Sequence, residues 1–448
     1  MAERAPIAVI GAGLSGALLA TLLARRGLEV SVYERRLDPR MAGAERGRSI
    51  NLAVSARGLA ALDQVGLADL ALSRALPMRG RMVHPPDGAT NLQPYSADGL
   101  RHINSIGRAE LNEALLDAAD RTDGVTIRFG HRLRDLDPPS GTMRFETADG
   151  EVSAVAPVVL ACDGAYSAAR AALASRDGFI SSQDYPEHGY KELTIPAKDG
   201  DFAVDPGALH IWPRTSSMMI ALPNLDRSFT CTLFWPNSEF AELDTAAKII
   251  DRFERDYPDV AGLMPSLVDD FTENPVGSLV TVTCWPWVVG RIGLVGDAAH
   301  AILPFFGQGA NCGFEDCIEI DRCLDESCGD WDAALDQYQR RRKDNTDVIA
   351  ELSRQNFVEM RDRVNSPWFR FRSRIEHGLE RHLGESYMSR YELVSFTTVP
   401  YSEIAPRLRR QRLRLLAGIG LAFVAVAGLA RALLSGPRKR NRRHSNLP

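Results

Sequence analysis

Cysteine is scarce in this sequence, and its spacing excludes two kinds of site. The 448 residues include seven cysteines, at positions 162, 231, 284, 312, 317, 323 and 328, and no Cys-x-x-Cys pair. An odd number without close pairs argues against a disulfide framework and favours a reducing compartment. The stretch around Cys312 and Cys317 also lacks the C-x(2 to 4)-C clasp of structural zinc sites. We therefore expect neither disulfides nor a bound metal.

Acidic residues are absent from the last part of the chain. Residues 407–448 hold 11 Lys or Arg and no Asp or Glu, so residues 1–406 keep 42 of the 53 basic residues against all 58 acidic ones, a net charge of −16. Such an acidic body argues against nucleic acid as a partner. The basic residues flank an apolar run at 413–434, which is about 33 Å long as a helix and could cross a bilayer.

We therefore expect a transmembrane or membrane-associated helix at 413–434 and a basic tail at 435–448. A helix lying in the membrane interface and a soluble packed helix remain as alternatives. Because the basic flanks are balanced, charge alone does not give the orientation.

One nucleotide-binding pattern is present, in IAVIGAGLSGALLATLLARRGLEVSVYER at residues 7–35. Gly11, Gly13 and Gly16 form a G-x-G-x-x-G turn between a predicted strand and a predicted helix. These glycines permit the tight turn, the approach of backbone N–H groups to a pyrophosphate, and close helix packing. Glu34 ends the second strand, where a carboxylate can accept hydrogen bonds from both ribose hydroxyls. The unit predicts a dinucleotide site and leaves FAD and NAD open.

Two further strands end at an acidic residue. VVLACDGAYSAAR at 158–170 contains Asp163, and RIGLVGDAAHA at 291–301 contains Asp297. Taken singly, each aspartate could cap a helix or face a nucleotide. The three segments in this order resemble the FAD-dependent aromatic hydroxylases, over about residues 5 to 345. The resemblance implies an α/β fold, with an FAD-binding Rossmann-like domain of the glutathione-reductase type, an interleaved antiparallel-sheet substrate domain, and C-terminal helices.

The implied domains alternate along the chain. The FAD-binding domain takes 1–75, 101–175 and 276–330, the substrate domain takes 76–100 and 176–275, and a helical region follows at 331–406.

Closer matches point to one group within that family. RGRSINLAVSARGLAALDQVGL at 46–67, GRMVH at 80–84, PFFGQGANCGFEDC at 304–317 and NFVEMRDRVNS at 356–366 resemble the kynurenine 3-monooxygenases. This resemblance implies that L-kynurenine is hydroxylated to 3-hydroxy-L-kynurenine with NADPH and O2, through a hydroperoxide formed on FAD. No Ser-His-Asp set is needed for flavin-borne chemistry, and we expect no catalytic side chain. The sequence has no second G-x-G-x-x-G for NADPH, so a transient binding groove is expected.

The resemblance also implies the site residues. Those implied to bind substrate are Arg81, Tyr95, Asn356 and Tyr391 at the carboxylate, with Glu359, Met360 and Phe305 near the ring. Those implied to bind the cofactor are Gly11, Gly13, Ser15, Gly16, Glu34, Arg35, Arg36, Ala53, Arg108, Leu133, Asp163, Ala168, Asp297, Pro304, Gly307, Gly309, Ala310 and Asn311. A guanidinium suits a carboxylate because its planar fork donates two hydrogen bonds.

Alternative functions remain open. The chain could hydroxylate another carboxylate-bearing aromatic, or could be a membrane-tethered flavoprotein that does not hydroxylate. The chain departs from the family pattern at Ala310 and Cys312, where Met and Ala are usual. These changes bear on the rate of the reaction, or on how fully NADPH oxidation is coupled to hydroxylation. The catalytic body is expected to face the cytoplasm, at the mitochondrial outer membrane in a eukaryote or the inner membrane in a bacterium. The pattern leaves the oligomeric state open.

Overall fold

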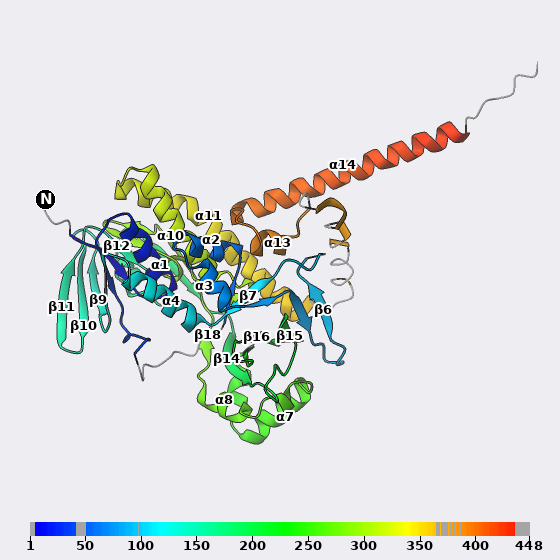
Figure 1. Cartoon of the computed structure of the whole chain (residues 1–448), viewed down its shortest axis with the longest axis horizontal. Helices are drawn as coiled ribbons and strands as arrows, with labels where there is room; N and C mark the ends of the chain where they lie inside the picture. Colours follow the sequence, from blue (N-terminus) through cyan, green and yellow to red (C-terminus); the bar gives the residue numbers. More distant parts are fainter. Residues whose placement is uncertain are drawn as a thin grey trace, which may run out of the picture.

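The computed structural model describes residues 5–41, 51–96, 98–363, 368, 375–376, 378–379, 381–384 and 387–434. Two sheets form the body, with helices α1, α4, α10 and α11 on one side and α7 and α8 below (Figure 1). α10 (Gly309–Glu326) and α11 (Trp331–Val358) are the long helices of the body.

The first sheet carries the Gly-rich turn. Its strand order is β20 (Val288–Val289), β21 (Ile292–Leu294), β12 (Val159–Ala161), β1 (Ile7–Ile10), β2 (Val30–Tyr33) and β8 (Val125–Arg128). The pairing is parallel throughout except at β20. β1 and β2 are buried along their whole length, which fits the wholly apolar sequence of β1 and the single serine, Ser31, in β2. The predicted α/β dinucleotide fold is confirmed.

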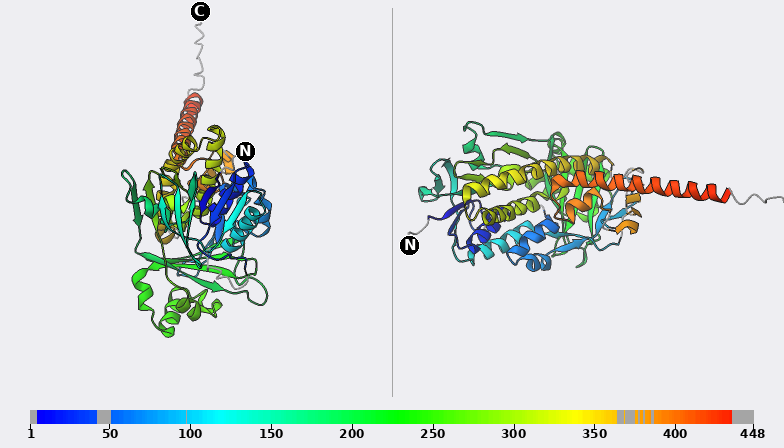
Figure 2. Two further views of the ribbon diagram at one scale, coloured as in Figure 1. Left: turned by 90° about the vertical axis from the view of Figure 1, so that its left-hand side faces the viewer. Right: turned by 90° about the horizontal axis from the view of Figure 1, so that it is seen from above.

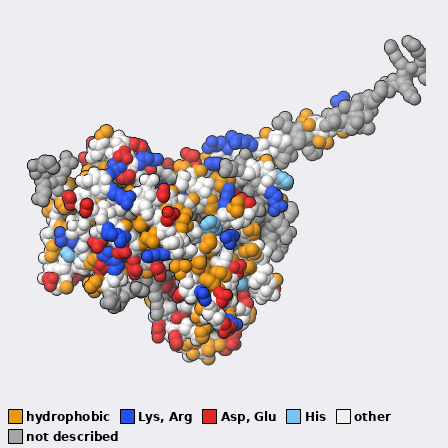
Figure 3. Space-filling model, viewed as in Figure 1, with side chains coloured by type: hydrophobic (Ala, Val, Ile, Leu, Met, Phe, Trp, Pro, Cys, Tyr) orange, Lys and Arg blue, Asp and Glu red, His pale blue; other side chains and the backbone are white. Residues whose placement is uncertain are grey.

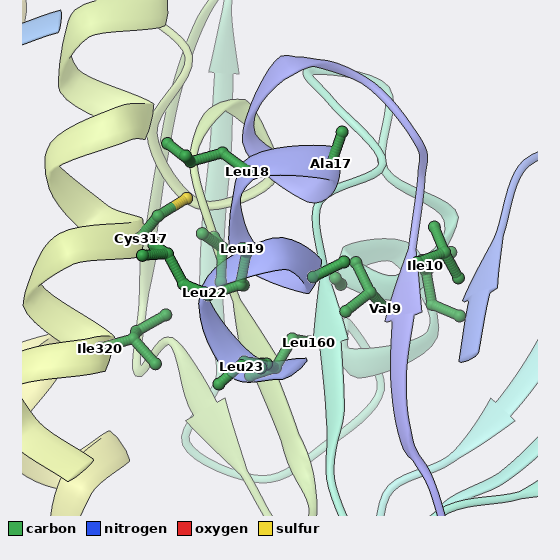
Figure 4. Close-up of a cluster of buried hydrophobic side chains, with 14 of the residues drawn as sticks. Val9, Ile10, Ala17, Leu18, Leu19, Leu22, Leu23, Leu160, Cys317 and Ile320 are labelled. Atoms are coloured by element: carbon green, nitrogen blue, oxygen red, sulfur yellow. The ribbon is translucent and has the colours of Figure 1, made fainter. Parts of the chain in front are cut away.

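Helix α1 (Leu14–Arg25) closes one face of this sheet. Figure 4 shows Leu19 and Leu22 of α1 between the sheet, at Val9 and Leu160, and helix α10, at Cys317 and Ile320. All these side chains are at most 5% exposed. The packing fixes the start of α1, and therefore the Gly-rich turn, against the strand ends. α4 (Arg108–Asp120) also packs on α1.

The second sheet has seven strands. Their order is β18 (Gly277–Ser278), β14 (His188–Ile195), β17 (Phe229–Pro236), β16 (Ser217–Pro223), β15 (Ala208–Arg214), β5 (Gly80–Val83) and β6 (Asn91–Pro94). All neighbours are antiparallel, as predicted for the segment from 176 to 275, except that β5 joins β15 in parallel. One face packs on α7 (Ala246–Asp256) and α8 (Leu267–Glu273) through Trp235, Phe253 and Phe271. The other face turns towards the first sheet.

Smaller elements connect the two sheets. The strands are β3 (Leu52–Val54), β7 (Ile103–Ile106) and β4 (Leu76–Met78) in one sheet, β9 (Arg132–Asp137), β10 (Thr142–Thr147) and β11 (Gly150–Val155) in a second, and β13 (Ile180–Asp184) with β19 (Thr281–Trp285). The helices are α2 (Ala56–Gln64), α3 (Ala68–Ser73), α5 (Ala168–Leu173), α6 (Asn237–Glu242), α9 (Asp297–His300), and the short turns η1 (Ala261–Leu263) and η2 (Pro304–Phe306).

The C-terminal part returns over the site and then leaves the body. After α11 come the π-helical turn η3 (Glu359–Arg363), α13 (Arg390–Ser395) and α14 (Tyr401–Leu434). Tyr401 and Ile404 anchor the start of α14 in a buried cluster. Leu408 packs on the same cluster and Gln411 is buried, and after them the helix extends away from the body in every view (Figures 1 and 2).

The projecting half of α14 exposes apolar side chains. Leu413, Leu416, Val424 and Val426 are each 65–71% exposed. Figure 3 shows Lys and Arg side chains gathered where this helix leaves the body. Within the described residues, however, no helix is long and apolar enough to cross a bilayer. The membrane helix at 413–434 is thus not supported by them; the side chains at 419, 421–423, 428–429 and 432–434, and the tail at 435–448, lie outside the described residues.

Candidate flavin and substrate site

A cavity of about 290 Å³ lies at the carboxyl ends of β1, β12 and β21, between the two sheets. Open parallel sheets bind ligands at this edge. Fifteen of the residues predicted from the sequence line it: Gly13, Ser15, Ala53, Arg81, Tyr95, Arg108, Asp297, Pro304, Phe305, Gly307, Gly309, Ala310, Asn311, Met360 and Tyr391. The two predicted sets of residues, for cofactor and for substrate, therefore meet in one space.

The Gly-rich turn leaves room for a ligand only at its centre. A Cβ on Gly16 would lie 1.9 Å from the Gly11 carbonyl oxygen, and one on Gly11 would lie 2.6 Å from the Cys162 oxygen. Gly11 also has a φ of +96°. A Cβ on Gly13 would meet no protein atom within 4 Å. The outer two glycines are thus required by the fold, while the open space at Gly13, beside the start of α1, fits the pyrophosphate of FAD.

Glu34 is a buried acceptor at the end of β2. Its Oε2 accepts from the Ala12 N–H at 2.9 Å, and its Oε1 accepts from the backbone N–H and the Nε of Arg36 at 3.0 and 2.8 Å. Burial alone would raise the pKa of Glu34, but the contacts with Arg36 and Ala12 outweigh it and lower the pKa. The carboxylate stays ionised beside the Gly-rich turn, as a ribose-binding group must.

Asp163 has one oxygen with nothing to bind. Its Oδ2 accepts from the Ala169 N–H at 3.1 Å, near the start of α5, while Oδ1 is buried without a partner among the described residues. Burial raises the pKa of Asp163. Because a buried polar atom without a partner is costly, this orphan oxygen beside Gly11 fits the polar groups of a bound dinucleotide. Asp297 begins α9 and faces the same cavity.

The segment from Pro304 to Asn311 forms the far wall of the cofactor space, and we call it the flavin cradle. Gly307 has a φ of +64°, and a Cβ there would lie 2.8 Å from the Cβ of Ala53. The Asn311 amide is used within the protein: Nδ2 donates to the Ala53 and Gly307 oxygens at 2.9 and 2.7 Å. The backbone of this segment, at the positive end of α10, is therefore the part available to a flavin, and negative charge is stabilised there.

The substrate end holds a buried cation beside two stacked phenols. Arg81 is 9% exposed and its Nε has no partner among the described residues. Its guanidinium carbon lies 4.3 Å from the ring centre of Tyr391, and Tyr391 stacks on Tyr95 with centroids 5.1 Å apart. Burial would lower the pKa of Arg81, but Tyr391, Tyr95 and Glu359 raise it overall. Burial raises the pKa of Tyr95 well above its usual value, so the phenol remains a neutral donor.

The second sheet, predicted from its alternating segments, supplies an apolar floor whose individual residues the sequence did not identify. Leu209, Ile220, Leu222 and Phe234 line the cavity from β15, β16 and β17. The alternation of Ile220 and Leu222 is a strand signal, but it does not tell which face meets a ligand. Phe305 stacks on Phe357 at 4.2 Å and closes the floor beside Met360.

Several predicted site residues lie outside the cavity lining. Asn356 is 2% exposed and donates to the Phe305 carbonyl at 2.6 Å, so it supports the wall. Glu359 pairs with Arg390 at 3.0 Å. Leu133 packs in the core of the first sheet, and Arg35 and Arg36 are exposed. The supporting residues Gly11, Gly16, Glu34 and Asp163 stand next to the cavity through the contacts given above, whereas Ala168 begins α5 outside the lining.

The cysteines and His300 behind the cradle are structural. Cys312 and Cys317 are fully buried in α10, and burial raises the pKa of both thiols. His300 contacts the buried Asp316, whose other oxygen accepts from Arg342 at 2.6 Å. In the part of the chain that the structure describes, no three His, Cys, Asp or Glu side chains are grouped to hold a metal.

Comparisons with known proteins agree with this architecture. A family model described as FAD binding domain matches residues 4–353. Among solved structures, 2-methyl-3-hydroxypyridine-5-carboxylic acid oxygenase superposes with a TM-score of 0.67 at 20% identity, covering 82% of this chain and 95% of that one. PqsL of P. aeruginosa, in complex with 2-aminobenzoylacetate, gives 0.65 at 20% identity, covering 80% and 99%. These likenesses support the fold.

Sequence relatives are more specific. The kynurenine 3-monooxygenase of Myxococcus xanthus is 49% identical over 407 residues, covering 89% of this chain and 88% of that protein. The enzyme of that name from Sus scrofa is 41% identical over 443 residues, covering 98% and 94%. The chain therefore belongs to the kynurenine 3-monooxygenase family of FAD-dependent monooxygenases.

Proposed function

We propose that this protein hydroxylates L-kynurenine at ring position 3, with NADPH as reductant and O2 as oxidant. The observation that carries the proposal is the buried Arg81, which lines an apolar cavity ending at the flavin cradle and whose Nε finds no partner within the described ranges. A ligand for this space has a carboxylate at one end and an aromatic ring at the other. Kynurenine has that form, and relatives bearing the enzyme's name span nearly the whole chain.

Arg81, Tyr95 and Tyr391 would bind the substrate carboxylate. The guanidinium supplies charge-assisted hydrogen bonds, and the phenols supply neutral donors. Because Arg81 stays a cation and Tyr95 a neutral phenol, no proton has to move when the carboxylate binds. The carboxylate would also satisfy Arg81 Nε and the Tyr95 hydroxyl, both of which are buried and find no hydrogen-bond partner in the described part of the chain.

The ring would lie on the apolar floor. Ile220, Leu222 and Phe234 offer no hydrogen bond and hold an aromatic ring by its faces and edges. Phe305 and Pro304 cover the side near the cradle and exclude water from it. When bound, FAD supplies the redox chemistry and the activation of O2. The protein's part is to align the ring carbon next to the aniline nitrogen with the flavin.

The experiment is a product assay with purified, FAD-loaded protein. NADPH oxidation is followed with L-kynurenine and with other carboxylate-bearing aromatics such as anthranilate, and products are identified by mass. The proposal is supported if kynurenine gives 3-hydroxykynurenine and none of the other aromatics gives a hydroxylated product. Hydroxylation of a different aromatic favours the broader hydroxylase reading, and FAD binding without any hydroxylated product favours a non-hydroxylating flavoprotein.

We also propose that α14 attaches the protein to a membrane with the catalytic body facing the cytoplasm. The exposed Leu413, Leu416, Val424 and Val426 and the arginines at 407, 409, 410, 412 and 414 support this. In a eukaryote the membrane would be the mitochondrial outer one, and in a bacterium the inner one. Carbonate treatment of isolated membranes tests it: a spanning helix stays with the membrane, and release contradicts spanning.

A further inference from the structure

Arg57, on α2, joins two distant parts of the chain beneath the site. It is 1% exposed. Its Nη1 donates to Glu315 on α10 at 2.6 Å, and its Nε donates to the Val394 carbonyl at 3.1 Å. Its Nη2 donates to the carbonyls of Leu393 and Val399. The carbonyls of a last helical turn lack intrahelical partners. Arg57 therefore caps the C-terminal end of α13, the helix that carries Tyr391.

Tyr401 lies against the same guanidinium. The Arg57 guanidinium carbon is 3.9 Å from the Tyr401 ring centre, a close cation–π contact. Tyr401 is fully buried, and burial raises the pKa of its phenol well above the usual value. The hydroxyl is therefore protonated, and it donates to Gln308 Oε1 at 2.9 Å.

Gln308 stands in the flavin cradle itself. It lies between Gly307 and Gly309, which both line the cavity, and its side chain is buried. The Ser55 hydroxyl lies 3.5 Å from the same Oε1, and the Gln308 Nε2 lies 3.4 Å from the Phe306 carbonyl. Because Oε1 accepts from the Tyr401 and Ser55 hydroxyls, the Nε2 of the same amide is directed to the Phe306 carbonyl. The two glycines contribute no side chain, so the path of this backbone depends on Gln308 and Asn311.

We propose that Tyr401 is a positioning residue of the reaction, which fixes the Gly307–Gly309 backbone against the flavin through Gln308 and couples it to the substrate-binding helix α13 through Arg57. The inference rests on the proposed hydroxylation. A substrate carboxylate that draws Tyr391 towards Arg81 would then act, through α13, Arg57 and Tyr401, on the segment that faces the flavin. The start of α14, at Tyr401, is therefore part of the catalytic body, whereas the projecting half of the helix is not.

The test is Tyr401→Phe in the full-length, FAD-loaded protein. This substitution keeps the ring on Arg57 and removes only the donor to Gln308. Tyr338→Phe is the matched control, because Tyr338 is equally buried and its hydroxyl donates to the Leu294 carbonyl at 3.1 Å, away from Gln308. In Tyr401→Phe we expect FAD retention, a KM for kynurenine within about twofold of wild type, and at least about a threefold rise in hydrogen peroxide formed per NADPH, as water reaches a loosened cradle. The visible flavin spectrum should shift in this variant alone.

A mutant cycle with Gln308→Met sharpens the test. If Tyr401 acts through Gln308, the double variant should produce no more peroxide than the worse single variant. Equal peroxide yields in Tyr401→Phe and Tyr338→Phe, or additive effects in the cycle, would overturn the proposal. If even the wild type forms no hydroxylated product, the proposed function fails, while the flavin spectra of the two Phe variants still decide whether Tyr401 positions the cradle.

Discussion

Replacing Arg81 by Met should separate carboxylate recognition from ring chemistry. The side chain is 9% exposed, and Met keeps much of its length and apolar contact. The lost interaction is a charge-assisted, two-pronged hydrogen bond in a buried setting, which contributes about 3–4 kcal/mol. At about 1.4 kcal/mol per decade, kcat/KM for kynurenine should fall by roughly two to three orders of magnitude. Arg81→Lys keeps the charge and loses the fork, so its loss should be smaller, about tenfold.

The assay compares kynurenine with kynuramine, its analogue without the carboxylate. Wild type should use kynuramine poorly, and Arg81→Met should use it about as well as wild type does, because nothing remains for the guanidinium to bind. FAD content and thermal stability serve as controls for folding. If Arg81→Met lowers the turnover of both compounds by the same factor, Arg81 does not recognise the carboxylate and the reasoning is wrong.

Three further predictions concern the turn, the pH response and the thiols. Without FAD, Gly13→Ala should melt at the wild-type temperature, but it should bind FAD at least about tenfold more weakly, whereas Gly16→Ala, whose Cβ would lie 1.9 Å from the Gly11 oxygen, should fail to fold; equal FAD affinity in Gly13→Ala and wild type contradicts this. Burial lowers the pKa of His210 to about 4, below its unfolded value near 6.5. Its contribution to stability is therefore complete above pH ~6.5 and is lost as the pH falls towards ~4, by up to about 3 kcal/mol, and urea titrations should show a flatter pH dependence for His210→Asn. Of the seven cysteines only Cys328 is exposed, so a thiol reagent should label one site rapidly in the native protein and all seven in denaturant; fast labelling of several native thiols would contradict the buried positions.

The cofactor half of the site was predictable because its signals are local. Gly11, Gly13 and Gly16 act within a single turn, and the strand and helix on either side are fixed by short apolar runs. The steric need for these glycines is visible in the structure as clashes at Gly11 and Gly16 and open space at Gly13. The segment from Pro304 to Asn311 was identified through its resemblance to the family.

The substrate half depended on family resemblance alone, and five of its seven predicted residues line the cavity. Arg81, Tyr95 and Tyr391 do meet, but Asn356 is turned to the Phe305 carbonyl. The sheet that forms the floor was predicted, but its lining residues Ile220, Leu222 and Phe234 were not, because alternation shows that a strand has two faces without showing what each face meets.

Arg57 gave no signal at all in the sequence. Its partners Glu315 and Val399 are 258 and 342 positions away, and an arginine in a helix is ordinarily a solvent-exposed residue. The parallel pairing of β5 with β15, which sets Arg81 beside the floor, is equally long-range. Local pattern therefore predicted the Gly-rich turn and resemblance identified the segment from Pro304 to Asn311, and only the assembled fold revealed what connects them to the substrate end.

The most direct test of the central claim is a turnover experiment under ¹⁸O2. Purified protein with FAD, NADPH and L-kynurenine should yield 3-hydroxykynurenine carrying one ¹⁸O atom, with close to one product formed per NADPH oxidised. NADPH oxidation that ends in hydrogen peroxide without labelled product, or a hydroxyl at another ring position, would contradict the account.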